Sequence, residues 1–289
     1  MGDERFYFGY GSNLNAEDWE AWCAGRGADP ASMKCIGSAW LLDHSMRFHY
    51  RSTGRKGGAA DVVKDGKGTV VPGALFALSD NGWELMDKKE GHPRHYQRVP
   101  VRVVTEEGQV VDAITYTVTP EKREASLVVP TEGYVNLIRD GLEIRNLPIE
   151  HLISSIEKYD SKSRLQHVFV YGTLMRGESR WPQLEPWSSS EVEVGHIIGR
   201  LYHLGTYPGV RLDQIGTVHG ELHRCEDIEN TLETLDLVEG HDEQHPGEGL
   251  YVRVPVLVQT AKGAVWAWTY VINEVPNAST RLQDGRWVS

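Results

Sequence analysis

The sequence predicts an α+β protein made of two tandem, related domains, each with several β-strands and a recurring helix. Its 289 residues are long for one core and suit two domains of roughly 100 to 200 residues each. Residues 5–14 (RFYFGYGSNL) and 167–175 (HVFVYGTLM) both place an aromatic and β-branched run before Tyr-Gly, a small hydroxyl residue and, soon after, a leucine. Similar segments recur in the same order along both halves. A duplicated domain is therefore the starting hypothesis.

Four further segments of the first half have a counterpart in the second half. Each pair shares a pattern of apolar residues around identical positions, such as Gly73 with Gly220 and Glu90 with Glu239. The matched segments are 70–79 with 217–225, 84–91 with 233–240, 96–101 with 251–256, and 113–118 with 267–272. Five matches in the same order are not expected by chance, and they indicate a repeat that covers most of the chain.

Strands are predicted for every matched segment except the one that ends in Glu-Gly. Period-2 alternation and enrichment in β-branched and aromatic residues support this assignment. Pro100 and Pro255 fall inside two of these strands. Because proline cannot donate a backbone hydrogen bond, we expect both prolines at a sheet edge or a bulge.

The Glu-Gly segment predicts the C-terminal end of a helix in both copies. Ser79 is suited to begin the first of these helices as N-cap, and Gly91 is placed to end it. In the second copy, apolar residues recur at helical spacing up to Gly240. Another helix is predicted after the first Tyr-Gly turn, with Asn15 as its N-cap. Pro182 and its neighbours oppose a comparable helix after the second turn.

Material between the two copies occurs only once. Residues 129–159 predict two amphipathic helices that are separated near 146–148. Residues 161–164 (SKSR) predict a polar connector. We therefore expect one domain at 1–163 and a second at 164–289.

Composition and charge exclude several classes of protein. The formal net charge is -11, with 41 acidic against 30 basic residues, so most of the surface should repel nucleic acid. No apolar stretch approaches the 18 or so residues of a membrane span, and the first residues lack the pattern of a secretory signal. Three cysteines without CxxC spacing (Cys23, Cys35 and Cys225) are typical of reduced thiols. We expect a cytoplasmic protein, with no membrane partner, that is a monomer with its two domains packed together.

The Tyr-Gly turn that follows each first strand predicts an anion-binding cradle. In the first copy, Tyr10–Leu14 link a strand to a helix start. Such a turn presents unpaired backbone N–H groups and the positive end of a helix dipole, which suit a carboxylate or phosphate group. GxGxxG and GxxxxGK[ST] are both absent, so this is not a nucleotide-binding loop. The alternative is that Gly11 only serves a tight turn.

Glu90 and Glu239 are the candidate acid/base residues. A helix C-terminus carries partial negative charge and favours Lys or Arg, so a carboxylate there should have a raised pKa. A residue that breaks such a rule often marks a functional site. The alternative is a pair of solvated glutamates at helix ends.

Two other chemistries are weighed and disfavoured. Ser12 could be a nucleophile, but the GxSxG elbow is missing and the aligned residue is Thr173. His241 and His245 are four residues apart, as in a zinc-binding helix, but flanking glycine and proline make this segment a loop. We therefore expect neither a metal ion nor a cofactor.

The motifs of the first half together resemble the γ-glutamylcyclotransferase family, including its butirosin-type members, which remove a γ-glutamyl protecting group. They are YGSNL, VVPGALFALS, the Glu-Gly at 90–91 and the Tyr-x-Arg strand at 96–98. The second half, with VYGTLMRGE, GRLYHLGTYPGV and HGELHRCED, is similar to the γ-glutamylamine cyclotransferase branch. The resemblance covers nearly the whole chain. Neither half has the YGSLIW-like opening of the glutathione-specific branch, which argues against glutathione as substrate.

The resemblance implies a fold and a set of site residues. Each domain would be a compact, barrel-like mixed sheet with flanking helices, and Glu90 and Glu239 would be the acid/base residues. Substrate would bind to Tyr10, Gly11, Ser12, Asn13, Leu14, Tyr96 and Tyr116 in the first domain, and to Tyr171, Gly172, Thr173, Leu174, Tyr251 and Tyr270 in the second. The expected partner is a small γ-glutamyl compound.

The implied reaction releases 5-oxoproline and a free amine without consuming water. A γ-glutamyl amide contains its own nucleophile, because its α-amine can reach the δ-carbonyl and close a five-membered ring. The protein then has to fold the substrate back and move protons, which needs no metal and no covalent intermediate. Two alternatives stay open at this point. One is a binding protein that holds a γ-glutamyl or acidic metabolite without turnover, and the other is a serine amidase that uses Ser12 and releases glutamate.

Overall fold

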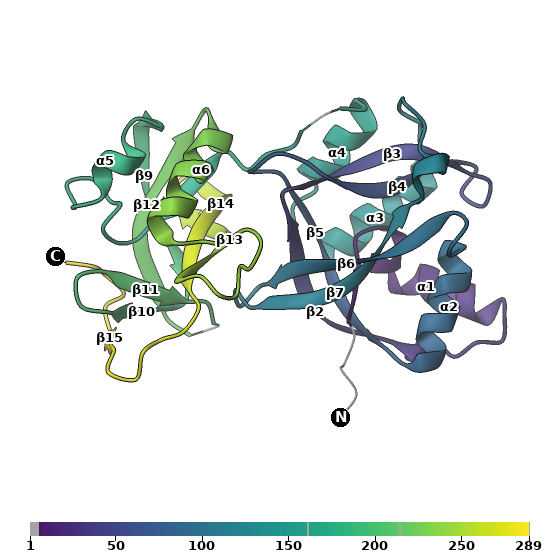
Figure 1. Cartoon of the computed structure of the whole chain (residues 1–289), viewed down its shortest axis with the longest axis horizontal. Helices are drawn as coiled ribbons and strands as arrows, with labels where there is room; N and C mark the ends of the chain where they lie inside the picture. The colour runs from purple at the N-terminus through teal and green to yellow at the C-terminus, as the bar shows by residue number, and fades with distance from the viewer. Residues whose placement is uncertain (1–5, 161, 214, 289) are drawn as a thin grey trace. The chain divides into compact units, whose positions relative to one another are not determined.

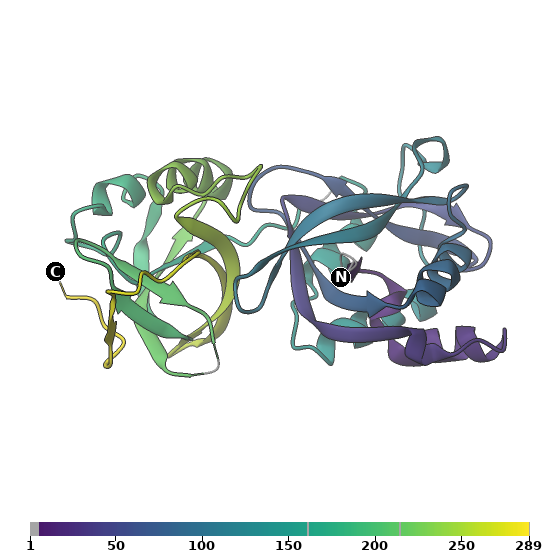
Figure 2. The ribbon, with the colours of Figure 1, turned by 60° about the horizontal axis from the view of Figure 1, so that its bottom comes forward.

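The computed structural model describes residues 6–160, 162–213 and 215–288. The chain divides into two compact units. Unit 1 contains the residues up to Thr105 and Val111–Arg164, and unit 2 contains Glu106–Val110 and the residues from Leu165 onward. Each unit has its own barrel-shaped sheet with helices at its side (Figure 1, Figure 2).

A closed five-stranded barrel forms the core of unit 1. Around the barrel, the strands follow the order β1 (Phe6–Gly9), β5 (Val70–Leu78), β2 (Met33–Leu42), β6 (Tyr96–Thr105) and β7 (Val110–Val118). Strand β1 runs antiparallel to β5 and parallel to β7. Large apolar side chains such as Phe8 and Trp40 fill the core. The strands predicted in the first copy are therefore confirmed.

Unit 2 repeats this barrel with the same connectivity. Its strands, in the equivalent order, are β8 (His167–Val170), β12 (Thr217–Cys225), β9 (Ser188–Ile198), β13 (Tyr251–Thr260) and β14 (Gly263–Ile272). Strand β8 is again antiparallel to the second strand and parallel to the last. Each strand occupies the place of its sequence counterpart, so the α+β fold and the tandem duplication are both confirmed.

The two aligned glycines serve the same close approach of neighbouring strands. A Cβ atom on Gly73 would lie 2.4 Å from the carbonyl oxygen of Gly9, and one on Gly220 would lie 2.2 Å from that of Val170. A side chain at either position would push the first strand away from the second. Glycine is therefore required at this point of both barrels.

The two strand prolines lie where their strands have a neighbour on one side. Strand β13 contacts β9 only at Gln259 and Thr260, well beyond Pro255. Strand β6 likewise contacts β2 only at its C-terminal end, beyond Pro100. At each proline the strand is therefore unpaired on one side, which agrees with the predicted edge position of a residue that cannot donate a backbone hydrogen bond.

Two capped helices of unit 1 follow the sequence prediction. Helix α2 (Asp80–Glu90) is capped by the side chain of Ser79 and ends at Gly91, which adopts a left-handed φ of 66°. Helix α1 (Ala16–Ala24) is capped by the side chain of Asn15. The two helices lie side by side at one end of the unit (Figure 1, Figure 2). This arrangement brings the end of α2 close to the start of α1.

Helices α3 (Glu132–Glu143) and α4 (Glu150–Glu157) confirm the two amphipathic helices expected between the copies. They are separated around Asn146, which has a left-handed φ of 53°. Helix α3 packs against the Tyr-Gly turn, and α4 packs against strand β3 (His44–Ser52). The connector expected at 161–164 lies partly outside the described residues, because Ser161 is not among them. None of the described helices is long and apolar enough to cross a membrane.

Unit 2 has a different set of helices. Helix α6 (Ile228–Glu239) is the counterpart of α2 and ends at Gly240, which has a left-handed φ of 65°. Helix α5 (Trp181–Leu184) has a single turn and starts with Pro182 next to its first residue. The prediction that no helix like α1 follows the second Tyr-Gly turn is thus confirmed.

The two units also differ in the hairpin that is inserted along the chain between two barrel strands, which are β2 and β5 in unit 1 and β9 and β12 in unit 2. Unit 1 inserts a long hairpin made of β3 (His44–Ser52) and β4 (Gly57–Lys64). Unit 2 inserts a shorter hairpin made of β10 (Arg200–His203) and β11 (Pro208–Arg211), which is extended by β15 (Thr280–Leu282). The repeat analysis did not predict these inserts, because they have no sequence counterpart in the other copy.

Candidate active sites

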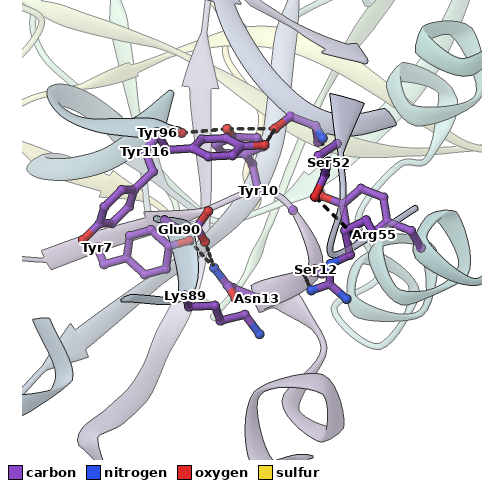
Figure 3. Close-up of a pocket in the computed structure, with 14 residues that line it drawn as sticks. Tyr7, Tyr10, Ser12, Asn13, Ser52, Arg55, Lys89, Glu90, Tyr96 and Tyr116 are labelled. Carbon is purple, nitrogen blue, oxygen red and sulfur yellow. Dashed lines mark hydrogen bonds between the residues drawn. The ribbon is translucent and has the colours of Figure 1, made fainter. Parts of the chain in front are cut away.

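A pocket of about 540 Å³ opens beside the Tyr-Gly turn of unit 1 (Figure 3). Its lining includes the predicted residues Tyr10, Gly11, Ser12, Asn13, Glu90, Tyr96 and Tyr116. It also includes residues that sequence reasoning missed, among them Tyr7, Ser52, Arg55, Ala60, Lys89 and Tyr134. The pocket is thus formed by several separate segments of unit 1. They include the turn, the end of α2, three barrel strands and the β3–β4 hairpin.

Glu90 lies at the base of this pocket and is held by Asn13. The Asn13 Nδ2 group donates to Glu90 Oε1 at 2.8 Å and lies 2.8 Å from the hydroxyl of Tyr7. Burial raises the pKa of Glu90, while the hydrogen bond from Asn13 and the Lys89 cation oppose the rise. A raised pKa makes a carboxyl group better suited to accept and return a proton.

A second carboxylate stands one helical turn before Glu90. Asp87 accepts two hydrogen bonds from Arg98, both at 2.9 Å, and one from the hydroxyl of Tyr116 at 2.6 Å. Because all its bonds are to strand residues, Asp87 fixes the end of α2 against the barrel. The same bonds fix the position of the Tyr116 ring in the pocket wall.

The Tyr-Gly turn presents backbone N–H groups as predicted. Residues Ser12–Leu14 form a 3₁₀ turn in which the Leu14 N–H donates to Gly11 at 3.0 Å. The N–H groups of Ser12 and Asn13 come first in the turn and have no acceptor within it. Both residues line the pocket, so their N–H groups are its candidate backbone donors.

Leu14 is an exception among the predicted residues, because it does not line the pocket. Its N–H group is used inside the turn, and its side chain is buried against Gly141 of α3. In a 3₁₀ turn, successive side chains point about 120° apart. Ser12 and Asn13 therefore reach the pocket, whereas Leu14 anchors the turn to the helix behind it.

A charged cluster forms one wall of the pocket. Arg55 donates to both oxygens of Asp18, at 3.0 and 2.9 Å, and to the hydroxyl of Ser12 at 2.8 Å. Lys89 donates to the same Asp18 at 2.8 Å. Burial alone would raise the pKa of Asp18, but its bonds with the two cations lower it to about 2. The cluster therefore carries two positive charges against one negative charge at neutral pH.

Unit 2 has an equivalent but smaller pocket of about 360 Å³. All of the residues predicted for it line the pocket: Tyr171, Gly172, Thr173, Leu174, Glu239, Tyr251 and Tyr270. The residues that were not predicted include Arg180, Tyr207 and Pro208. The repeat thus brings its shared pattern of turn, glutamate and tyrosines together a second time.

Glu239 is more isolated than Glu90. Leu174 stands where Asn13 stands in unit 1, and Val168 stands where Tyr7 does. Glu239 is buried, and this burial raises its pKa to about 7, with only the Arg180 cation opposing the rise. Around Glu239, apolar neighbours replace the polar ones of Glu90, so fewer groups stabilise its charged form.

The supporting contacts of the first pocket recur in the second. Asp236 accepts from Tyr270 at 2.7 Å and from Arg253 at 3.1 Å, in the same pattern as Asp87. Tyr171 donates to the carbonyl oxygen of Tyr270 at 2.6 Å, just as Tyr10 does to that of Tyr116. The two pockets therefore share the same arrangement of supporting hydrogen bonds.

The geometry supports neither a serine nucleophile at Ser12 nor a metal site. In the part of the chain that the structure describes, the Ser12 hydroxyl bonds Arg55 and no histidine. A serine nucleophile would need a base within hydrogen-bond distance. Among the described residues, no group of three or more His, Cys, Asp or Glu side chains could hold a metal ion.

Each of the two barrels thus combines, in one pocket, a Tyr-Gly turn with a glutamate whose pKa is raised by burial. The chain belongs to the family described as gamma-glutamyl cyclotransferase, AIG2-like, whose sequence profile matches residues 7–136 and 168–289. The family resemblance seen in the sequence is therefore confirmed for both halves.

Two named relatives each match less than half of the chain. A Vibrio cholerae protein, provisionally named a gamma-glutamylcyclotransferase, is 30% identical over 132 residues, which is 43% of this chain and 96% of the relative. The gamma-L-glutamyl-butirosin B gamma-glutamyl cyclotransferase of Niallia circulans is 31% identical over 121 residues, 42% of this chain and 75% of the relative. A solved structure titled gamma-glutamyl cyclotransferase is 24% identical and covers 55% of this chain and 92% of its own, with a TM-score of 0.45.

Proposed function

We propose that this protein is a γ-glutamylcyclotransferase that releases 5-oxoproline and a free amine from a small γ-glutamyl amine or γ-glutamyl amino acid. One observation carries the proposal. In both units a glutamate with a raised pKa, at a helix end, lines the same pocket as a Tyr-Gly turn with backbone donors. The names of the two relatives support the same activity.

The first task of the site is to hold the glutamyl group in a folded conformation. The N–H groups of Ser12 and Asn13 are suited to the α-carboxylate, as are those of Thr173 and Leu174 in unit 2. The tyrosines of the pocket wall restrict the methylene chain. Bringing the α-amine next to the δ-carbonyl can supply on the order of 7 kcal/mol of the barrier.

The second task is proton transfer. Glu90 or Glu239 takes a proton from the α-ammonium group, which frees the nitrogen lone pair to attack the δ-carbonyl carbon. The new C–N bond closes the ring, and the carbonyl oxygen carries the negative charge until it collapses. The carboxyl group gives its proton to the nitrogen of the scissile amide, and the amide C–N bond breaks as the oxyanion collapses. The ring nitrogen, which still carries two protons, gives one of them to the carboxylate, and this proton leaves with the free amine, which is an ammonium ion at neutral pH. A single positioned acid/base contributes roughly 10²- to 10⁴-fold.

The product distinguishes this reaction from hydrolysis. We expect a panel of γ-glutamyl compounds in heavy-oxygen water to yield 5-oxoproline without solvent oxygen. Chelators should not change the rate, because the proposed nucleophile belongs to the substrate. Release of glutamate that carries solvent oxygen would contradict the proposal and favour the amidase. Tight binding without any turnover would favour the binding protein.

A further inference from the structure

The two pockets differ in the wall that their inserted hairpins contribute. The hydroxyl of Tyr96 donates to the carbonyl oxygen of Ala60 in the β3–β4 hairpin at 2.8 Å. Its counterpart Tyr251 donates to the carbonyl oxygen of Pro208 in the β10–β11 hairpin at 2.6 Å. Matched tyrosines thus fix both hairpins at the same place. The hairpins therefore form equivalent walls from unrelated sequences.

The wall of unit 1 presents a cation with unused donors. Arg55 lies beside Ser12, on the far side of the pocket from Tyr7 (Figure 3). Its side chain is 28% exposed, and its guanidinium group lies over the ring of Tyr134 at 4.9 Å. The bonds to Asp18 and Ser12 use three of its five N–H donors. The Nε–H and one Nη1–H have no partner among the described residues.

The wall of unit 2 is apolar at the same place. Pro208 packs directly on the turn, since a Cβ atom on Gly172 would lie 2.3 Å from the Pro208 ring. At Gly11 of unit 1, the nearest atom to such a Cβ is the Tyr134 hydroxyl, at 3.6 Å. The second pocket is accordingly the smaller one. A charged group that fits beside the first turn would meet a proline ring at the second.

Arg180 of unit 2 is not the counterpart of Arg55. Its guanidinium group donates to the carbonyl oxygen of Val238, the residue before Glu239. Lys89 is likewise the residue before Glu90. Among the described residues that line the pockets, each pocket therefore has one cation at the helix end, next to the glutamate, and unit 1 has a second one, Arg55, on its hairpin wall.

Groups that the two pockets share serve the part of the substrate that both must bind, and groups that differ serve the part that can vary. We propose that Arg55 binds a carboxylate on the leaving amine, so that unit 1 selects γ-glutamyl compounds whose leaving half is anionic. Unit 2, with Pro208 in the equivalent wall, selects an uncharged leaving amine. This inference rests on the proposed cyclotransferase function.

A matched pair of substrates isolates the role of Arg55. γ-Glutamyl-alanine and γ-glutamyl-ethylamide differ only in the carboxylate of the leaving half. Their kcat/KM values for 5-oxoproline release are measured in the full chain with Glu239→Gln, which silences unit 2. The selectivity is the kcat/KM value for γ-glutamyl-alanine divided by that for γ-glutamyl-ethylamide. It is compared among chains with Arg55 intact, with Arg55→Gln and with Arg55→Lys. Thermal unfolding of each variant confirms that it is folded.

We expect γ-glutamyl-alanine to be preferred and Arg55→Gln to lower the ratio by about 10-fold or more, the usual effect of a lost charged hydrogen bond. Arg55→Lys should restore part of it. In a Glu90→Gln chain, where only unit 2 works, Arg55→Gln should leave the ratio unchanged. An equal loss of kcat/KM for both substrates would overturn the inference and assign Arg55 to the glutamyl half. If neither kcat/KM value changed, the inference would also be overturned, and Arg55 would serve only to hold Asp18 in place. If neither substrate yields 5-oxoproline with Arg55, Glu90 and Glu239 all intact, the proposed function itself is refuted.

Discussion

The glutamates of the two units occupy the same point of the repeat but differ in their neighbours. Glu90 accepts a hydrogen bond from Asn13 and has Lys89 beside it, whereas Glu239 has the apolar Leu174 in place of that amide. The pKa is raised at both positions, and at Glu239 it reaches about 7. One fold thus holds two versions of a site, and the polar neighbours rather than the helix end tune the carboxyl group.

The largest expected difference is in catalysis. Glu90→Gln should lower kcat/KM of unit 1 on its best substrate by about 10²-fold or more, because glutamine keeps the size of the side chain but cannot carry the proton. Glu239→Gln should leave more than half of the turnover of that substrate. Steady-state kinetics of both variants, with circular dichroism as the folding control, check this. The reverse ranking would show that unit 2 is the main site.

The ion pairs Arg98–Asp87 and Arg253–Asp236 occupy equivalent positions but differ in exposure, so they should contribute differently to the stability of their units. Arg253 is fully buried, whereas the side chains of Arg98 and Asp87 are about one third exposed. Asp236→Ala should therefore destabilise unit 2 by about 3 to 5 kcal/mol, and Asp87→Ala should destabilise unit 1 by only about 1 kcal/mol. Calorimetry of the full-length variants measures both. Equal losses would contradict the contrast.

Glu239 should also make the stability of unit 2 depend on pH. Its pKa is about 7 in the folded protein against an ordinary value of 4.5, so the folded state holds the proton more tightly than the unfolded state. The stabilisation is complete below about pH 4.5 and is lost as the pH rises through 7, a total of roughly 3 kcal/mol. Glu239→Gln should remove this part of the slope in denaturant unfolding. A slope that persists unchanged in the variant would rule out Glu239 as its source.

A smaller effect should follow when the neighbours of the two glutamates are exchanged. Asn13→Leu gives Glu90 the apolar neighbour that Glu239 has, so its pKa should rise and the acid limb of kcat/KM should move up by about one pH unit. The profile is recorded with Glu239→Gln present. Leu174→Asn in a Glu90→Gln chain is the matched control and should move the limb down. Identical profiles with and without the Asn13→Leu substitution would show that the amide does not tune the base.

Because the domain is repeated, the residues and secondary structure that both sites share could be predicted from the sequence. Alignment of the two halves paired Glu90 with Glu239 and Gly73 with Gly220, and the strands, caps and helix ends followed from local patterns. Pairing two copies was informative because shared features are retained for shared reasons. The exception, Leu14, failed because the sequence alone does not show which way a residue of a 3₁₀ turn points.

The residues that distinguish the pockets were beyond sequence reasoning for a physical reason. Arg55 meets Ser12 across 43 positions, and Lys89 meets Asp18 across 71. Such contacts depend on where an inserted hairpin or a distant helix end folds back. The burial of Arg253 likewise depends on the whole barrel.

The central claim is that one glutamate in each unit provides the acid/base for its own pocket. It is tested most directly by 5-oxoproline release from a chain that carries both Glu90→Gln and Glu239→Gln, compared with each single variant at equal concentration. The account predicts that each single variant retains turnover of the substrate suited to its intact pocket, and that the double variant falls to the uncatalysed background while remaining folded. Sustained release by the double variant would contradict the account.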